Sequence, residues 1–551
     1  PIFTFAIENA LFGMESARVY HITNLILHLF VVFMVYRFCL VMNISKRAAI
    51  FATLLFAIHP MRVESVAWVT ERKDVLFAAF YFPALFYYVK WLQSKDRKNF
   101  YFAIIMVLFT FSLFSKIQAV ALPLSMLTLD YYFKRPLQLK LIMEKIPYFG
   151  LSLAVGLLGV YMLSENESLK DVTNYSLFER LFVGSWSYCI YLVKWIVPYE
   201  MSPLYPYPGN DDIPIYFYFS VIGVAAVAAL VWWAWKNEKR YIVFGITFFT
   251  FNVMFLLQIL GAGQGFTADR FTYVPYFGLF FLMAVGLDKL ATQQKAYENI
   301  IVYSALAYAL VFSYMTYQQN KIWKNGETLW THVLKYYDKA TTPWSNRGQY
   351  YRDNGMTELA LADYNQAISL KQDAGTLNSR GKLYFDSGNA QQAITDYTAS
   401  INVDPTVGEV YVNRGAAYGS LQQYDQAIKD ISEGLRLDPE NINGYLNRSL
   451  LHYMLGNYAA AHEDHTSYLS RNPYKPEMWY ERAITKRRLG RDQESIADFT
   501  QAINLQQRDL FYLERAKAYR ALGNNQQALL DAQQAQALGS QDAAALIQEL
   551  R

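Results

Sequence analysis

The 551-residue sequence predicts an all-α protein, in which a bundle of transmembrane helices is followed by a solenoid of helical repeats. Two observations give this prediction. Residues 1 to about 318 are apolar blocks separated by short polar breaks. From about residue 340 the chain is polar, and a motif recurs every 33 or 34 residues, a period typical of helical repeat proteins. We therefore expect a membrane domain over 1–318, a linker over 319–340 and a repeat domain over 341–551.

Composition narrows the classes of function. The chain is 53% hydrophobic and 17% charged, with a formal net charge of +4 and no basic stripe, which argues against a nucleic-acid partner. Cys39 and Cys189 are the two cysteines, and both lie in apolar segments, so neither a disulfide framework nor a cysteine-based zinc site is expected. The sequence begins at Pro1 without a signal peptide, and we expect the natural N-terminus to lie further upstream.

The apolar runs predict membrane spans because a helix needs about 20 apolar residues to cross a bilayer. Ten ranges are candidates: 20–40, 46–59, 75–92, 100–115, 117–133, 147–163, 215–235, 240–260, 274–290 and 298–318. Residues 1–13 are too short to cross and should lie at the interface. The range 179–197 is interpreted as an in-plane or re-entrant helix, because its crossing would place the basic sequence WKNEKR (235–240) outside the cell.

Orientation follows from the basic residues of the loops. One set of loops carries most of them, including Lys134, Lys239 and Arg240, and is therefore predicted to face the cytoplasm. The opposite set would face the periplasm or a lumen, as would the chain after the last span.

Two charged segments lie between the apolar runs on this outer side. They are HPMRVESVAWVTERKD (His59–Asp74) and ADRFTYVPYFG (Ala268–Gly278). Charges at a membrane edge are costly unless they face water, one another or a ligand. Together with Lys116, the two segments are predicted to form the mouth of a site for a charged, lipid-linked substrate. The alternatives are an interfacial helix whose charges pair among themselves and, for Lys116, a snorkelling anchor.

The repeat half shows six units, starting near 341, 374, 408, 442, 476 and 509. Their seventh residue is Arg, their eighth is small and their twenty-third is Asp. This is the tetratricopeptide (TPR) pattern of helix–turn–helix units. The Arg and Asp residues predict an ion-pair ladder that staples the helices: Arg347, Arg380, Arg414, Arg448, Arg482 and Arg515 with Asp363, Asp396, Asp430, Asp464, Asp498 and Asp531.

The sixth residue of each unit should point toward the concave face of the solenoid. Asn occupies this position at Asn346, Asn413 and Asn447. Asn side chains hydrogen-bond an extended backbone without reading its sequence. We therefore expect these three residues to bind a protein or peptide.

Several motifs together resemble one family. HPMRVESVAWVTERKDVL, Ser115–Lys116 followed by LPLSMLTLDYY, YPYP at Tyr205–Pro208 and ADRFTYVPYFGL are similar to bacterial relatives of the transmembrane-and-TPR (TMTC) mannosyltransferases. The resemblance covers nearly the whole chain. It implies a GT-C-type glycosyltransferase that moves a sugar from a polyprenyl-phosphate donor to a protein hydroxyl on the outer face. It also implies an integral protein of the bacterial inner membrane, with lipid as a partner and the TPRs in the periplasm.

The matched positions give the predicted substrate site: His59, Glu64, Arg72, Lys73, Lys116, Asp269, Arg270 and Tyr273. In the family reading Arg72, Lys116 and Arg270 neutralise the lipid phosphate, while Glu64 and Asp269 orient the sugar or a metal. No cofactor and no metal ligand are assigned, and a divalent metal stays an open alternative.

The catalytic residue is left unassigned. GT-C enzymes carry an acidic residue in the first external loop, and we expect that residue before Pro1. Two other readings stay open. One is a non-catalytic, membrane-anchored TPR scaffold for envelope protein assembly, and the other is an O-antigen-ligase-like enzyme.

Overall fold

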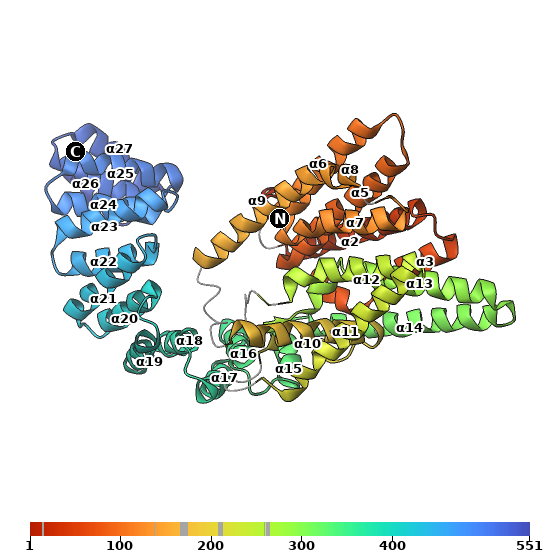
Figure 1. The fold of residues 1–551 in the computed structure, drawn as a ribbon. Coiled ribbons are helices and arrows are strands. Elements are labelled where there is room, and N and C mark those ends of the chain that lie inside the picture. The colour runs from red at the N-terminus through yellow and green to blue at the C-terminus, as the bar shows by residue number, and fades with distance from the viewer. Residues whose placement is uncertain (14–15, 137, 166–174, 208–212, 258, 260–264) are drawn as a thin grey trace. The chain divides into compact units, whose positions relative to one another are not determined.

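The computed structural model describes residues 1–551 except 14–15, 137, 166–174, 208–212, 258 and 260–264 (Figure 1). The chain divides into two compact units, Pro1–Asp338 and Lys339–Arg551. Both are helical, which confirms the predicted fold class. Among the described residues the strands are limited to one antiparallel pair, β1 (Tyr205–Pro206) and β2 (Gly265–Thr267).

In its described residues the first unit contains fifteen α-helices and several short 3-10 helices. The α-helices are α1 (Ile2–Phe12), α2 (Ala17–Val41), α3 (Lys46–Ile58), α4 (Val63–Ala67), α5 (Arg72–Gln93), α6 (Lys98–Ser115), α7 (Leu122–Tyr132), α8 (Leu139–Met143), α9 (Ile146–Glu165), α10 (Leu177–Ile196), α11 (Ile215–Lys236), α12 (Arg240–Val253), α13 (Tyr276–Gln293), α14 (Glu298–Ile322) and α15 (Gly326–Leu334). The 3-10 helices are η1 (Pro60–Arg62), η2 (Val69–Glu71), η3 (Ile117–Ala121), η5 (Met254–Leu256), η6 (Asp269–Thr272) and η7 (Lys295–Tyr297).

The membrane helices of this unit differ in number from the ten predicted spans. In the described residues five helices are long and apolar enough to cross a bilayer, or six if a bent pair counts as one span. The five are Ala17–Val41, Val69–Gln93, Lys98–Ser115, Ile215–Lys236 and Lys295–Ile322, and the bent pair is Lys46–Ile58 with Pro60–Ala67. These helices make the first unit a membrane domain.

The other predicted spans form shorter or more buried helices. The range 117–133 is divided into η3 and α7, with Pro123 in the first turn of α7. Helix α12 buries residues such as Phe244, Phe248 and Phe249 against its neighbours. These side chains form the core of the bundle and do not face lipid. Apolar content alone cannot separate helices that face lipid from helices that pack inside the bundle, so the predicted spans outnumber the long apolar helices of the described residues.

Helices α12 and α13 cross at a point where side chains would not fit (Figure 1). A Cβ atom on Gly245 would lie 2.7 Å from the Gly278 carbonyl oxygen, and one on Gly278 would lie 2.3 Å from that of Gly245. The two glycines therefore permit backbone contact. This contact fixes the start of α13, which directly follows the second charged segment.

Two other predicted ranges have defined secondary structure. The range 179–197, predicted as an in-plane helix, forms α10, which packs against α11 and β2. The range 319–340, predicted as a linker, contains the end of α14 and the helix α15. Val333 in α15 is fully buried, and His332 Nε2 lies 2.9 Å from the Met201 carbonyl oxygen. This segment is therefore part of the first unit.

The second unit is a regular array of helix pairs. The first helix of each pair begins at the residue where the sequence repeat places the start of a unit. The helices are α16 (Thr341–Asp353), α17 (Thr357–Leu370), α18 (Ala374–Asp386), α19 (Ala390–Val403), α20 (Gly408–Ser420), α21 (Tyr424–Leu437), α22 (Ile442–Met454), α23 (Tyr458–Arg471), α24 (Pro476–Arg488), α25 (Asp492–Leu505), α26 (Asp509–Ala521), α27 (Asn525–Ala537) and the final α28 (Ala543–Leu550).

The predicted ion-pair ladder is present in all six units. The Arg at position seven of each unit forms an ion pair with the Asp sixteen residues later, at 2.6 to 2.8 Å. This pair joins the two helices of one unit. From Arg380 onward Nη1 also donates to a side chain of the preceding unit, at 2.7 to 3.4 Å. The guanidinium thus staples both the helices and the repeats. The small residue at position eight allows the two helices of a unit to pack closely. A Cβ atom on Gly415, for example, would lie 2.6 Å from Ile431 Cγ1.

Removing one carboxylate of the ladder should loosen two neighbouring repeats. Asp430→Ala leaves Arg414 half-buried with Thr398 as its remaining side-chain partner, so we expect the array to lose about 2 kcal/mol locally. Hydrogen exchange of the full chain should show faster exchange across α20–α22. Glu433→Ala on the same helix breaks an exposed pair with Arg436 and should leave exchange unchanged. Equal effects of the two changes would contradict the assigned role of the ladder.

Candidate functional site

The two charged segments adjoin each other at one end of the membrane helices. Helix α3 ends at Ile58, and the chain bends by 55° into η1 and α4. His59 accepts a bond from the Met61 amide at 3.4 Å and so begins the turn that Pro60 favours. The second segment forms η6, which contacts both η1 and α4. Residues about two hundred positions apart are thereby brought into one cluster.

The centre of this cluster is Glu64 with Arg270. The Glu64 carboxylate pairs with the Arg270 guanidinium and accepts the Arg270 backbone amide at 2.8 Å. Arg270 Nε lies 3.5 Å from Glu71 Oε1, and Lys73 Nζ lies 3.1 Å from the same oxygen. Burial alone would lower the pKa of Arg270, but the carboxylates of Glu64 and Glu71 raise it above its ordinary value. Arg270 therefore remains a cation.

A second pair continues the cluster. Asp74 pairs with Lys116 and accepts a hydrogen bond from Ser65 Oγ at 3.0 Å. The Phe271 ring connects the two pairs, since its centroid lies 5.8 Å from Lys116 Nζ and 5.1 Å from Arg270 Cζ. Lys116 and Arg270 therefore both lie next to the Phe271 ring.

Exposure separates the cations of the cluster from its carboxylates. The side chains of Arg270 and Lys73 are 21% and 42% exposed, whereas those of Glu64 and Glu71 are each 4% exposed. The Trp68 ring lies 5.5 Å from Arg270 Cζ and is itself partly exposed. Solvent or a ligand therefore meets basic groups and an indole, with the acids beneath them.

Asp269 belongs to a different set of contacts. Its Oδ1 accepts a hydrogen bond from the Tyr205 hydroxyl at 2.6 Å and lies 3.7 Å from Lys194 Nζ. Burial raises the pKa of Asp269, and Lys194 opposes the rise; burial also lowers the pKa of Lys194. The pairing of β1 with β2 sets Tyr205 opposite Thr267 and so brings the YPYP motif to the second segment. Pro208 lies outside the described residues.

The contacts of Asp269 were not foreseen from the sequence. Lys194 was counted only as a loop charge, although a lysine in an apolar helix is itself a signal of a buried partner. The structure therefore adds Lys194 and Tyr205 as residues that hold η6 in place.

Three of the predicted site residues lie in the interior. Arg72 is fully buried and bonds Glu8 Oε2 at 2.6 Å, Asn24 Oδ1 at 2.8 Å and the Tyr20 carbonyl oxygen at 3.0 Å. Each nitrogen of Arg72 thus donates to a partner inside the protein, and the side chain does not reach the surface where a lipid phosphate would lie. We infer that it holds α1 on α2, and this replaces the role predicted for it.

His59 and Tyr273 are the other two interior residues. His59 lies among the rings of Tyr276, Phe280 and Phe312, with Nε2 3.3 Å from the Trp195 carbonyl oxygen. The Tyr273 hydroxyl lies 2.6 Å from His28 Nδ1. Neither side chain reaches the surface, and the aromatic neighbours of Arg270 are instead Trp68 and Phe271.

The divalent metal that the sequence left open finds no fitting ligands here. In the described residues no three His, Cys, Asp or Glu side chains are grouped as a metal would require. Glu64 and Asp269 each pair with a basic side chain, Arg270 and Lys194 respectively.

The concave side of the repeats contains a cavity of about 490 Å³. Asn413 and Asn447 line it, as do Asn443, Phe385 and the charged pair Arg352 and Asp353. Asn413 also donates to Asn378 Oδ1 at 3.0 Å. Asn346 is half-buried and is not among the lining residues. Two of the three predicted peptide-binding residues are thus brought together.

Both units of the chain contain segments that match known protein families. Residues 2–162 match the family model described as dolichyl-phosphate-mannose-protein mannosyltransferase. Residues 341–373, 374–407, 408–441 and 476–509 match tetratricopeptide repeat models. Protein O-mannosyl-transferase F38B6.6 of Caenorhabditis elegans is 23% identical over 368 residues, which is 64% of this chain and 50% of that protein.

Human relatives match in the same way. Protein O-mannosyl-transferase TMTC3 of Homo sapiens is 20% identical over 64% of this chain and 42% of its own length. Protein O-mannosyl-transferase TMTC1 of Homo sapiens is 25% identical over 26% of this chain and 17% of its own length. The chain is a low-identity homologue of the TMTC O-mannosyl-transferases. It spans about half the length of these relatives or less.

Two solved structures are similar to part of the chain. A crystal structure of MamA is 22% identical, covers 30% of this chain and 91% of its own, and has a TM-score of 0.29. A tetratricopeptide repeat protein from Parabacteroides merdae is 21% identical, covers 48% and 98%, and has a TM-score of 0.30.

The interior position of Arg72 has a measurable consequence. Arg72→Ala leaves Glu8 buried without its cation and should lower the free energy of unfolding by about 3 kcal/mol. Lys73→Ala, one residue away and half exposed, should change it by less than about 1 kcal/mol. Thermal unfolding of the two variants in the same detergent measures the difference. An Arg72→Ala variant as stable as the original protein would contradict the assigned role of Arg72 in holding α1 on α2.

Proposed function

We propose that this protein is a membrane glycosyltransferase that moves a sugar from a polyprenyl-phosphate donor to a hydroxyl group of a protein. One observation carries the proposal. Arg270 and Lys116, from segments far apart in sequence, meet around Phe271 as partly exposed cations at one end of a membrane domain. The homology of that domain to mannosyltransferases supports the same reading.

The arrangement suits a lipid-linked phosphate. Arg presents several donors in a planar fork that matches phosphate oxygens, and Lys adds a compact charge. The Arg270 side chain is held from below by Glu64 and Glu71, so its orientation does not depend on the ligand. The Trp68 indole beside it offers a face on which a sugar ring can stack.

The proposed step breaks the bond between the anomeric carbon and the phosphate oxygen. The acceptor hydroxyl oxygen forms the new bond to that carbon, its proton passes to a carboxylate, and the departing phosphate takes up negative charge. Arg270 and Lys116 stabilise that charge as it develops. We assign no residue of this chain as the carboxylate, and we propose that Glu64 orients Arg270 rather than the sugar. The relatives are named for mannose, which is therefore the first sugar to test.

The repeats would present the acceptor. The cavity lined by Asn413 and Asn447 contains amide groups, which bind the backbone of an extended chain whatever its sequence. From the distribution of basic residues among the loops we expect the charged cluster and the repeats to lie on the outer face of the membrane. Donor and acceptor would then meet on the same side.

The second candidate is a non-catalytic TPR scaffold. It is favoured by the complete pairing of the clustered charges, because Glu64 with Arg270 and Asp74 with Lys116 also fit an interfacial structure that binds nothing. The two hypotheses differ in the expected effect of substitutions in the charged cluster. Such substitutions should lower sugar transfer by an enzyme and should not affect the function of a scaffold.

Removing the Arg270 guanidinium should abolish most transfer. We expect Arg270→Ala to lower kcat/KM for polyprenyl-phosphate mannose about 100-fold in membrane vesicles, by analogy with the loss of a charge-stabilising donor. Arg270→Lys should recover part of the rate. Arg97→Ala, an exposed arginine between α5 and α6, serves as the control and should retain full activity. Undiminished transfer by a folded Arg270→Ala protein would exclude the assigned role.

Loss of the concave amides should weaken acceptor binding without changing the donor step. Asn413→Ala with Asn447→Ala should raise the KM for an acceptor peptide about tenfold, the effect of losing roughly 1.4 kcal/mol. The kcat at saturating peptide should stay within about twofold of the original, since these residues belong to a different unit from the charged cluster. Asn525→Ala, an exposed asparagine of α27, is the matched control. An unchanged KM in the double variant would move peptide binding away from this cavity.

A further inference from the structure

The end of the membrane helices opposite the charged cluster contains a second cavity, of about 680 Å³. The turn between α2 and α3, the end of α7, the turn between α11 and α12, and α13 near its end all contribute to its wall. Asn43, Lys134 and Glu238 have positive φ angles of 59°, 59° and 51° at these turns. The cavity is therefore built by helix ends that all lie at the same edge of the bundle.

Basic groups dominate this cavity. Lys134, Lys239, Arg240 and Lys289 line it, against the two carboxylates of Glu238 and Asp288. In the part of the chain that the structure describes, no ion pair joins any of the four cations to a carboxylate. Clustered cations without counter-ions repel one another unless an anion lies between them.

Two of the wall residues strengthen this reading. Asp288 is engaged elsewhere, since its Oδ1 accepts from Arg47 Nε at 2.6 Å. Arg240 donates from Nη1 to the Tyr131 carbonyl oxygen at 2.6 Å, but its Nε is buried and has no hydrogen-bond partner among the described residues. A buried guanidinium nitrogen left unsatisfied is costly, and an anion in the cavity would satisfy it.

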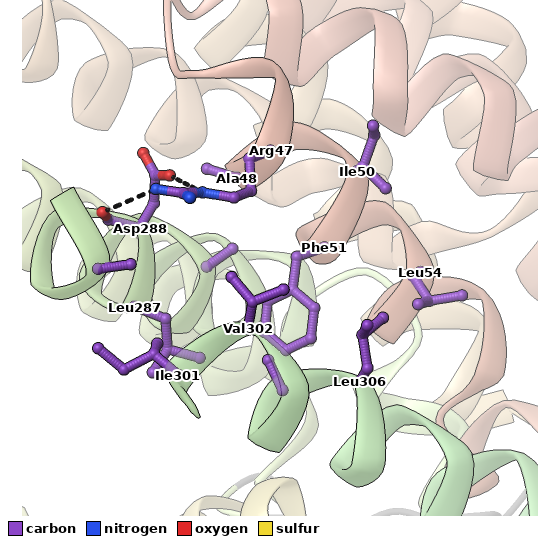
Figure 2. Close-up of a pocket in the computed structure, with 13 residues that line it drawn as sticks. Arg47, Ala48, Ile50, Phe51, Leu54, Leu287, Asp288, Ile301, Val302 and Leu306 are labelled. Carbon is purple, nitrogen blue, oxygen red and sulfur yellow. Dashed lines mark hydrogen bonds and ion pairs between the residues drawn. The ribbon is translucent and has the colours of Figure 1, made fainter. Parts of the chain in front are cut away.

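An apolar groove adjoins the basic cavity. Its volume is about 350 Å³, and α3, α13 and α14 form it. Figure 2 shows Val302 against the Phe51 ring and Leu306 facing Leu54, with the Arg47–Asp288 pair at one end of the groove. Ala48 and Asp288 line both hollows, so the groove and the cavity share a wall.

We propose that these two hollows together bind one anionic glycerophospholipid, with the phosphate headgroup in the basic cavity and an acyl chain in the groove. Charge decides the class of lipid. A choline or ethanolamine headgroup would add a cation next to four others, whereas a phosphatidylglycerol headgroup adds none. Basic residues at the cytoplasmic edge of a membrane protein attract the anionic lipids of that leaflet. This site is independent of the proposed transfer reaction.

Such a lipid would connect helices whose other ends carry the charged cluster. It would contact α3, which leads into Glu64, and α12 and α13, which flank Arg270. The lipid would therefore brace the bundle from the opposite leaflet, and its binding should raise thermal stability.

Native mass spectrometry of the purified full chain tests the proposal. The protein in detergent would be titrated with phosphatidylglycerol, with phosphatidylcholine of the same chains, and with inorganic phosphate. We expect at least tenfold tighter binding of phosphatidylglycerol than of phosphatidylcholine, and no competition by phosphate at equal concentration. Equal affinity for the two lipids, or full competition by inorganic phosphate, would overturn the proposal.

Matched variants separate the headgroup from the chain. Lys239→Gln with Lys289→Gln removes two exposed cations of the cavity and should abolish the preference for phosphatidylglycerol. Lys95→Gln with Lys98→Gln removes two exposed cations from the same end of the bundle, outside the cavity, and should preserve it. Ala305→Phe fills the groove and should weaken both lipids about tenfold. Equal losses in the two lysine pairs would show nonspecific attraction and would also overturn the proposal.

Discussion

The cost of holding charge at the edge of an apolar bundle organises the first unit. Glu64 and Asp74 are almost fully buried, and each is compensated by a cation from another segment, Arg270 and Lys116. Because a buried carboxylate without a partner is strongly unfavourable, these pairs fix the bend after α3 and the turn before α13 relative to each other. The close contact of Gly245 with Gly278 then sets the position of α13 itself.

The same pairing leaves the cations outward and the acids inward. The carboxylates orient the Arg270 guanidinium and the Lys116 ammonium from the inner side. Part of each cation remains exposed on the outer side, where a ligand could bind. Asp269 shows the opposite arrangement. Lys194 and Tyr205 enclose it, and it serves to hold the turn rather than to meet a substrate.

The second unit uses ion pairs for a different purpose. Each Arg–Asp pair joins two helices, and the remaining guanidinium nitrogen reaches the preceding unit, so one residue type connects the array in both directions. These pairs are partly exposed, and their contribution is repeated rather than large at any one place. Asn413 and Asn447 line the cavity of this unit and take no part in the ladder.

The sequence by itself determined the all-α class, the register of the six repeats and the two charged segments, because apolar length, a fixed period and charge density are local properties of a chain. Only the tertiary structure decided which charges face a ligand. Arg72 and Arg270 are equally basic in sequence, yet Glu8 and Asn24 enclose the first, whereas the second stays partly exposed. Helix α12 is a second example, because its apolar residues predict a membrane span and the structure shows that many of them pack inside the bundle. Whether a side chain is buried depends on residues that are distant in sequence, and a local sequence pattern does not identify those residues.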